Sequence, residues 1–176
     1  MKLKKLSEKI KLNGKEIISS KKKCFIVAEI SANHGGDLNT MLKTIKKAKA
    51  VGADAVKIQS YQPETMTLNV KNKHFLINDK SIWKGKYLFD LYKEAFTPFK
   101  WHKKIFQAAK KEKILCFSAP FDISAVNLLE SLGCPIYKIA SPEIEDLKLI
   151  ERVARTKKPI IISTGIASEK DISVAI

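Results

Sequence analysis

Apolar runs of strand length alternate with stretches of helical spacing along most of the chain. Five runs are apolar on both faces and predict strands at 24–31, 55–61, 114–120, 136–142 and 159–165. Residues 39–53, 99–113, 123–133 and 146–157 carry apolar positions at helical spacing and predict helices between them. Strands without a polar face need helices on both sides, so the pattern predicts a parallel sheet in an α/β fold.

Two segments depart from this alternation. Before the first strand, Asn13-Gly14 separates two alternating segments, which predicts a β-hairpin within residues 1–23. Residues 62–97 are too long for an ordinary strand-to-helix connection, and the aromatic segment 82–96 within them predicts a short helix over a site. Thr97 and Pro98 then suit the N-cap and first turn of the next helix.

The number of strand-helix units leaves two α/β architectures open. A complete eight-fold barrel usually needs about 250 residues, whereas this chain has 176. The chain is therefore either a shorter open sheet or the first five units of a TIM (β/α)8-type barrel. In the second case residues 24–176 form a partial barrel domain after the hairpin of residues 1–23.

The charge of the chain is strongly positive but carries little information about partners. The formal net charge is +15, and arginine contributes only Arg152 and Arg155. Nucleic-acid readout favours arginine and interleaved aromatic residues, so we expect a solvated, lysine-rich surface and no nucleic-acid binding. The sequence lacks an apolar run of 18 residues and a secretory leader, which predicts a cytoplasmic protein without membrane contact.

The cysteines and two of the histidines suggest no separate chemistry. Cys24, Cys116 and Cys134 show no CxxC spacing and are expected to be buried free thiols. His102 lies beside lysines on a predicted amphipathic helix and is expected to be a solvated surface imidazole. His34 follows the first strand, close enough to the strand end to be a candidate for substrate contact.

Polar residues near the ends of the predicted strands are the informative feature. These residues are Glu29, Lys57, Gln59, Ser118, Lys138, Ser141 and Glu143. Ligands of parallel α/β proteins bind at the carboxyl ends of the strands. A Lys57–Glu29 pair could be purely structural, since a buried ammonium group needs a partner. A second lysine, with hydroxyl groups nearby, favours a site for a phosphate or carboxylate. A nucleotide is disfavoured because GxGxxG and P-loop motifs are absent.

Six ordered segments carry a resemblance to a known family. They read AEISANHGGDL, ADAVKIQSYQPETMTL, YLFDLYKEAFTPFKWH, ILCFSAPFD, YKIASPEI and KPIIISTGIAS. Together they resemble the sialic acid synthase family, and most closely its bacterial pseudaminic acid synthase branch. The resemblance implies a TIM barrel that condenses phosphoenolpyruvate with an open-chain N-acetylated amino sugar. Phosphate is released and a nine-carbon 2-keto sugar acid is formed.

The resemblance also implies roles for individual residues. Glu29 is similar to the carboxylate at the reacting centre, and Lys57 and Lys138 are similar to ligands of phosphoenolpyruvate. Ser118 and Ser141 match hydroxyl residues that help to hold phosphoenolpyruvate, and Gln59 and Glu143 match positions that face the sugar. The segment SYQPETMTL points to a 2,4-diacetamido-2,4,6-trideoxy hexose, with Trp83 and Tyr87 either beside it or packing the loop.

Parts of the family pattern lie outside these residues. The family's Mn²⁺ or Mg²⁺ is held by two histidines on later strands, so the resemblance implies no metal ligand within residues 1–176. An antifreeze-like C-terminal domain, which implies a homodimer, is also not matched. We therefore expect a truncated or split member with an unpaired sheet edge and low stability on its own.

Three other functions remain open at this point. An N-acetylneuraminate synthase would use N-acetylmannosamine as its sugar. An aldolase-type or deoxy-keto-acid phosphate synthase barrel would share lysines at strand ends, and a Schiff base would distinguish the aldolase type. A non-catalytic remnant would bind a sugar or an anion without turnover.

Overall fold

The computed structural model describes residues 9–12 and 14–176. Strands β1 (Lys9–Leu12) and β2 (Lys15–Ser19) pair antiparallel and form the expected hairpin. Gly14, in its turn, has a φ of +77°, a backbone region that glycine enters at little cost. Residues 1–8 of the predicted hairpin segment, and Asn13 of its predicted turn, lie outside the described residues.

The main sheet has five parallel strands in the order of the sequence. They are β3 (Val27–Glu29), β4 (Ala55–Ser60), β5 (Leu115–Pro120), β6 (Tyr137–Ile139) and β7 (Ile160–Ile162). Each strand was predicted, although β3, β6 and β7 are shorter than their apolar runs. Because every strand pairs in parallel with the next, all carboxyl ends lie at one edge of the sheet.

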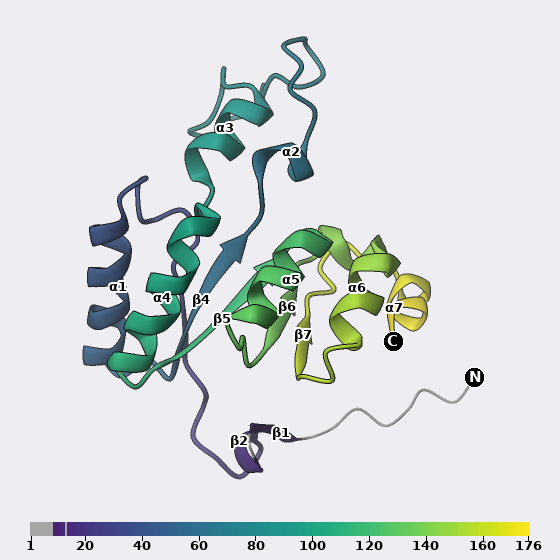
Figure 1. Cartoon of the computed structure of the whole chain (residues 1–176). Helices are drawn as coiled ribbons and strands as arrows, with labels where there is room; N and C mark the ends of the chain where they lie inside the picture. Colours follow the sequence, from purple (N-terminus) through teal and green to yellow (C-terminus); the bar gives the residue numbers. More distant parts are fainter. Residues whose placement is uncertain (1–8, 13) are drawn as a thin grey trace.

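Helices cover the sheet in two neighbouring groups. Helices α1 (Leu38–Ala50) and α4 (Phe99–Lys111) pack together beside β4, and α5 (Ile123–Ser131) and α6 (Leu147–Ala154) lie beside β5 to β7 (Figure 1). Helix α7 (Glu169–Ala175) follows β7. None of the helices in the described part of the chain is long and apolar enough to cross a membrane.

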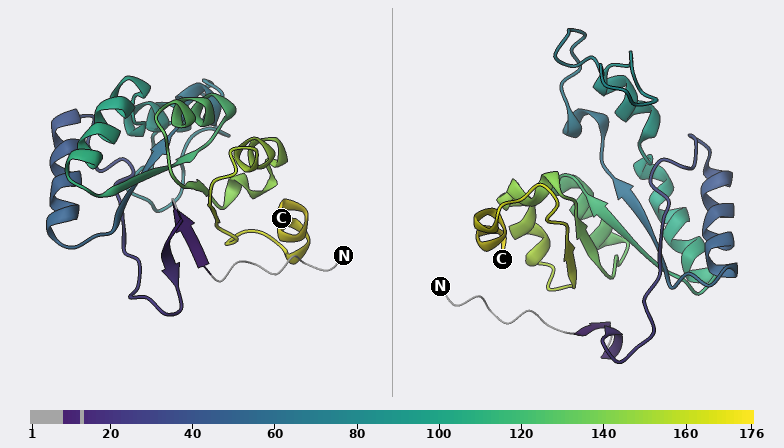
Figure 2. Two further views of the ribbon diagram at one scale, coloured as in Figure 1. Left: turned by 60° about the horizontal axis from the view of Figure 1, so that its bottom comes forward. Right: turned by 180° about the vertical axis from the view of Figure 1, so that it is seen from behind.

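Two apolar clusters form the core. Met41, Ile45, Ile58 and Ile105 join α1 and α4 to β4, and a second cluster around Phe117 joins β5 and β6 to α5 and α6. Leu12 and Ile17 of the hairpin, together with Phe25, pack against the second cluster. The hairpin thus lies at the amino-terminal end of the strands (Figures 1 and 2).

The segment 62–97, here called the β4–α4 connection, lies beyond the carboxyl end of β4 (Figure 1). It contains α2 (Pro63–Met66) and α3 (Leu88–Ala95), and α3 is the short helix expected within residues 82–96. The buried Tyr61 donates a hydrogen bond to the Tyr92 carbonyl at 3.3 Å, and Thr65 Oγ1 donates to Asp122 Oδ2 at 2.8 Å. These bonds attach the start of the connection to its own helix and to the loop after β5.

The structure corrects two local predictions. Pro98, not Thr97, occupies the N-cap position of α4, because the Thr97 side chain turns into the protein toward His34. Cys24 is exposed because it precedes β3 and lies outside the sheet, whereas Cys116 and Cys134 are buried as expected.

Candidate active site at the carboxyl ends of the strands

The first part of the candidate site is an ion pair between neighbouring strands. Glu29 of β3 and Lys57 of β4 are register partners, and Lys57 Nζ forms an ion pair with Glu29 Oε2. The backbone amide of Ser31 donates to Glu29 Oε1 at 3.0 Å. The Lys57 side chain is 16% exposed and that of Glu29 is 41% exposed, so the carboxylate is the more accessible partner.

Gln59 lies two positions further along β4 and therefore shares the face of Lys57. Its Oε1 accepts a hydrogen bond from Ser31 Oγ at 2.8 Å. Ser31 thus holds both Glu29, through its amide, and Gln59, through its hydroxyl. It was not among the residues expected from the sequence, although the polar run after the strand could have pointed to it.

The second cation, Lys138 of β6, is held by the next strand. Its Nζ donates to Ser163 Oγ at 2.5 Å and to the Ile139 carbonyl at 2.8 Å. Burial lowers the pKa of Lys138, and the charge of Lys57 lowers it further, while Glu143 and Glu29 act in the opposite direction. The charges of Lys57, Glu29 and Glu143 thus all act on Lys138.

Ser141 and Glu143 extend the site beyond β6, at the 3₁₀ turn η1 (Pro142–Glu145). Among the described residues, Glu143 Oε2 is buried and has no hydrogen-bond partner. Burial raises the pKa of Glu143, and the charge of Lys138 partly opposes this effect. Ser141 Oγ accepts a hydrogen bond from the Ile166 amide at 3.0 Å, which joins this turn to the loop after β7.

Ser118 does not join this group, although it lies on a neighbouring strand. Ser118 is the register partner of Ile58, whose side chain faces the helices, and it is fully buried. Its Oγ lies 2.7 Å from Ser60 Oγ and 3.1 Å from the Ile58 carbonyl oxygen. The phase of β5 therefore turns this hydroxyl away from the face of Lys57.

His102 is buried, so the prediction of a solvated surface imidazole is wrong. It is fully inaccessible, and its Nε2 lies 2.7 Å from Ser60 Oγ. Flanking lysines suggested a surface position, but His102 lies on the inner face of α4 with Ile105 and Ala109. His34 is also buried and lies 3.3 Å from Thr97 Oγ1.

Trp83 and Tyr87 interact with lysines of the β4–α4 connection. The Trp83 side chain is partly exposed, with Lys86 Nζ 5.4 Å from its ring centroid. Lys71 Nζ lies 5.8 Å from the ring centroid of Tyr87. Both contacts lie within the connection, and contact of either ring with the sugar stays a prediction.

A metal ion in this protein would need a group of side chains that could hold it. Across residues 9–12 and 14–176, no three or more His, Cys, Asp or Glu side chains form a group that could hold a metal ion. The ammonium groups of Lys57 and Lys138 are hydrogen-bond donors of the kind that bind phosphate or carboxylate groups.

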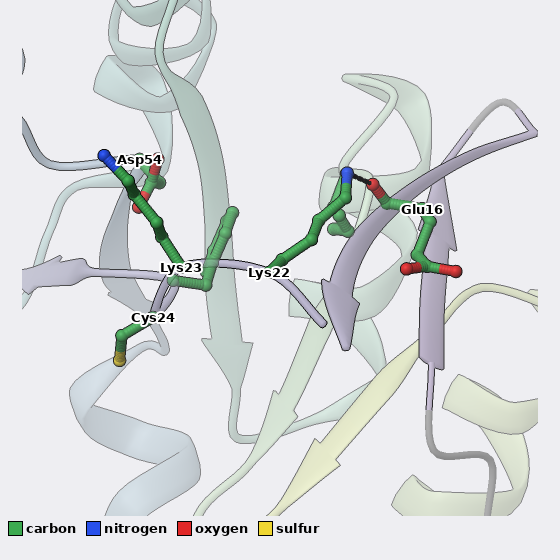
Figure 3. A pocket seen from close by; sticks show the side chains of 7 residues that line it. Glu16, Lys22, Lys23, Cys24 and Asp54 are labelled. Atoms are coloured by element: carbon green, nitrogen blue, oxygen red, sulfur yellow. Dashed lines mark hydrogen bonds between the residues drawn. The ribbon is translucent and has the colours of Figure 1, made fainter. Parts of the chain in front are cut away.

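A separate cavity of about 450 Å³ lies near the hairpin. Figure 3 shows Lys22, Lys23, Cys24 and Asp54 around it, with Lys22 Nζ donating to the Glu16 carbonyl. Asp54 immediately precedes β4 and accepts a hydrogen bond from the Ile26 amide at 2.8 Å. This cavity therefore lies at the amino-terminal end of the strands, opposite the candidate site.

Solved structures of other proteins share the architecture of this chain. The N-acetylneuraminic acid synthetase of Leptospira borgpetersenii, crystallised with citrate, matches 96% of this chain and 54% of its own, with a TM-score of 0.80 and 33% identity. The spore coat polysaccharide biosynthesis protein SpsE of Bacillus subtilis matches 95% of this chain and 43% of its own, with a TM-score of 0.72 and 29% identity. The five-stranded sheet is therefore half of a TIM-type barrel, as the second of the two predicted architectures requires.

Sequence relatives agree with these structures. The pseudaminic acid synthase of Helicobacter pylori is 50% identical over 151 residues, and that of Campylobacter jejuni serotype O:2 is 48% identical. In both cases the match covers 86% of this chain and 44% of the relative, so the chain spans less than half the length of these relatives. The model of the NeuB family matches residues 44–176. The chain belongs to the NeuB family, which confirms the resemblance found in its sequence.

Proposed function

We propose that these residues form the phosphoenolpyruvate side of a synthase site for nonulosonic acids. The observation that carries this proposal is the pair of partly buried cations, Lys57 and Lys138, on the parallel strands β4 and β6. Phosphoenolpyruvate carries a carboxylate and a phosphate, and two point cations are matched to that pair of anions. The Lys57–Glu29 ion pair alone would have supported a structural role.

The proposed reaction joins C3 of phosphoenolpyruvate to the aldehyde carbon of an open-chain N-acetylated amino sugar. The aldehyde oxygen takes up a proton, one water is consumed, and inorganic phosphate leaves, so that a 2-keto acid remains. Lys57 and Lys138 would stabilise the charge of the enol carboxylate and the departing phosphate. Glu29 holds Lys57 and Ser163 holds Lys138, so the two ammonium groups would not need to move during the reaction.

The two carboxylates have different environments and therefore suit different roles. Glu29 is held by Lys57 and the Ser31 amide and can accept a proton from water or a sugar hydroxyl. Glu143 is half-buried, burial raises its pKa, and its Oε2 has no hydrogen-bond partner among the described residues, so it is proposed to contact a sugar hydroxyl. Gln59 lies beside Glu29 on the same rim and is proposed to contact the sugar.

The identity of the sugar is proposed from the relatives. Identity to the pseudaminic acid synthases is 47–50%, against 37% for an N,N'-diacetyllegionaminic acid synthase and 29% for an N-acetylneuraminate-9-phosphate synthase. We therefore propose a pseudaminic-type 2,4-diacetamido-2,4,6-trideoxy hexose. The family resemblance adds a divalent metal and a homodimer. Among the described residues, no group of three or more His, Cys, Asp or Glu side chains could hold this metal.

Binding of phosphoenolpyruvate tests the proposal directly. Calorimetric titration of the full chain should detect binding, and Lys57→Met and Lys138→Met should each weaken it by about tenfold or more, since each removes a charged hydrogen-bond donor. Lys46→Met is the matched control, because Lys46 is an exposed lysine of α1. Equal affinity for all three variants would contradict the proposed anion site.

Turnover separates the proposed function from its alternatives. Phosphate release is measured with phosphoenolpyruvate, Mn²⁺ and either the diacetamido sugar or N-acetylmannosamine. Faster release with the diacetamido sugar supports the pseudaminic branch, and the reverse supports an N-acetylneuraminate synthase. Binding without release, in the presence of both substrates, indicates a binding remnant. A Schiff base trapped on Lys57 or Lys138 by borohydride would show an aldolase-type reaction instead.

A further inference from the structure

Two buried histidines meet at the point where the β4–α4 connection returns to the body of the protein. That point is Thr97-Pro98, directly before α4. His34, from the loop after β3, is 1% exposed, His102 of α4 is 0% exposed, and Thr97 is 1% exposed. Neither histidine belongs to the candidate site described above, although the loop with His34 and the strand next to His102 both contribute to it.

His102 ends a chain of hydrogen bonds that starts on β5. Its Nδ1 lies 3.2 Å from the Pro98 carbonyl, which can only accept, so Nδ1 carries the proton. Nε2 must then accept the hydroxyl hydrogen of Ser60, 2.7 Å away. Ser60 Oγ in turn lies 2.7 Å from Ser118 Oγ. One neutral tautomer of His102 thus joins the carboxyl ends of β4 and β5 to the first turn of α4.

His34 makes the corresponding attachment to the loop after β3. The Gly36 amide donates to His34 Nδ1 at 3.1 Å, so Nδ1 is unprotonated. Nε2 therefore carries the proton and donates to Thr97 Oγ1 at 3.3 Å. The His34 ring also packs edge-on against Trp101, with centroids 5.5 Å apart and an interplanar angle of 78°.

These attachments act on the same rim that holds the candidate sugar contacts. Ser60 follows Gln59 on β4, and the two side chains point to opposite faces of the strand. The β4–α4 connection and the loop after β3 together line a cavity of about 270 Å³, with Ala32, Gly36 and Trp83 among its walls. Ala32 directly follows Ser31, the partner of Gln59. A shift of Thr97-Pro98 would therefore change this cavity and the surroundings of Gln59.

We propose that His34 and His102 are positioning residues for the sugar end of the site. By holding Thr97-Pro98 against the ends of β4 and β5, they fix the β4–α4 connection beside the loop after β3, which carries Ser31, the partner of Gln59. The assignment to the sugar rests on the proposed function, whereas the attachment itself does not. Neither histidine touches the reacting atoms in this proposal.

Hydrogen exchange measured by mass spectrometry on the full chain tests the attachment. His102→Phe keeps a ring but loses both hydrogen bonds, and should raise exchange in residues 88–101 by about tenfold or more. His102→Gln, whose amide oxygen can still accept from Ser60, should restore much of the protection. His74→Gln is the control, because His74 is exposed. Ser60→Ala, which removes one link with little loss of volume, should resemble His102→Phe.

Two results would overturn the proposal. One is unchanged exchange in residues 88–101 of both His102→Phe and Ser60→Ala. The other is an equal rise across β5 to β7 in both, which would show general destabilisation.

Ligand measurements then test the assignment to the sugar. Ser60→Ala should raise the KM or Kd of the diacetamido sugar several-fold and leave the Kd of phosphoenolpyruvate unchanged. Weaker binding of phosphoenolpyruvate alone would contradict the assignment. If the unaltered chain binds no phosphoenolpyruvate, the proposed function fails, while the exchange result still decides whether the histidines hold the connection.

Discussion

The stability of the protein should depend on the neutral state of His102. Burial lowers the pKa of His102 from 6.5 to about 4, and hydrogen bonds to the backbone at Pro98 and Phe99 offset only part of this effect. In the interval between those two values the unfolded chain binds a proton that the folded protein does not. The free energy of unfolding therefore rises with pH across this interval. The contribution of His102 to it is fully present above about pH 6.5 and is lost as the pH falls toward 4.

The magnitude follows from the size of the interval. The pKa falls from 6.5 to about 4, and each pH unit corresponds to about 1.4 kcal/mol, so His102 contributes about 3 kcal/mol of pH-dependent stability. This is a large share of the 5–15 kcal/mol typical of a folded domain. It should therefore be visible in equilibrium urea unfolding.

The test compares urea unfolding of the parent protein and His102→Gln between about pH 7.5 and 4.5. At neutral pH the variant should be less stable, and the difference should shrink by most of about 3 kcal/mol as the pH falls. Burial also lowers the pKa of His34 and raises that of Glu143. Both groups are present in both proteins, so their effects on stability cancel in the difference between the two. His74→Gln serves as the matched control. Parallel curves for the parent and His102→Gln would refute the reasoning.

Two further predictions concern single side chains. Ser163→Ala removes one of the two acceptors that hold Lys138 Nζ, so it should weaken phosphoenolpyruvate binding several-fold. In the same calorimetric titration, this loss of affinity should be smaller than that of Lys138→Met. An unchanged affinity would show that Ser163 does not orient the lysine. Cys24 should react with a thiol reagent at once, whereas Cys116 and Cys134 should react only after unfolding. Burial shields the two latter thiols from the reagent and raises the pKa of Cys134 to about 11. Rapid reaction of more than one thiol in the folded protein would contradict the packing.

The sequence predicted the layout of the fold because strand and helix periodicities are local. All five parallel strands and the helix within residues 82–96 lie where the pattern placed them. The pairing of Lys57 with Glu29 was also within reach of the sequence, since a buried ammonium group needs a partner and parallel strands share a rim. The strand pattern alone left an open sheet and a barrel both possible, because curvature depends on how successive strands pair. The family resemblance pointed to the barrel, which the solved relatives confirm.

Residues that depend on strand phase and helix orientation were harder to place. The Ser118 hydroxyl was expected beside phosphoenolpyruvate, but the register of β5 turns it toward the helices. His102 has lysine neighbours in sequence, yet the packing of α4 on β4 buries it against Ser60. Whether a polar side chain faces ligand or core is set by contacts between distant segments, which local periodicity does not encode.

The sequence by itself thus determined which residue types reach the strand ends and which family the chain resembles. The tertiary structure alone decided that Lys138 is held by Ser163 and that His34 and His102 contact Thr97 and the Pro98 carbonyl. Each of those contacts joins residues from different elements, so it forms only when the strands and helices pack. Its energy depends on burial, because a hydrogen bond between groups shielded from water cannot be replaced by solvent.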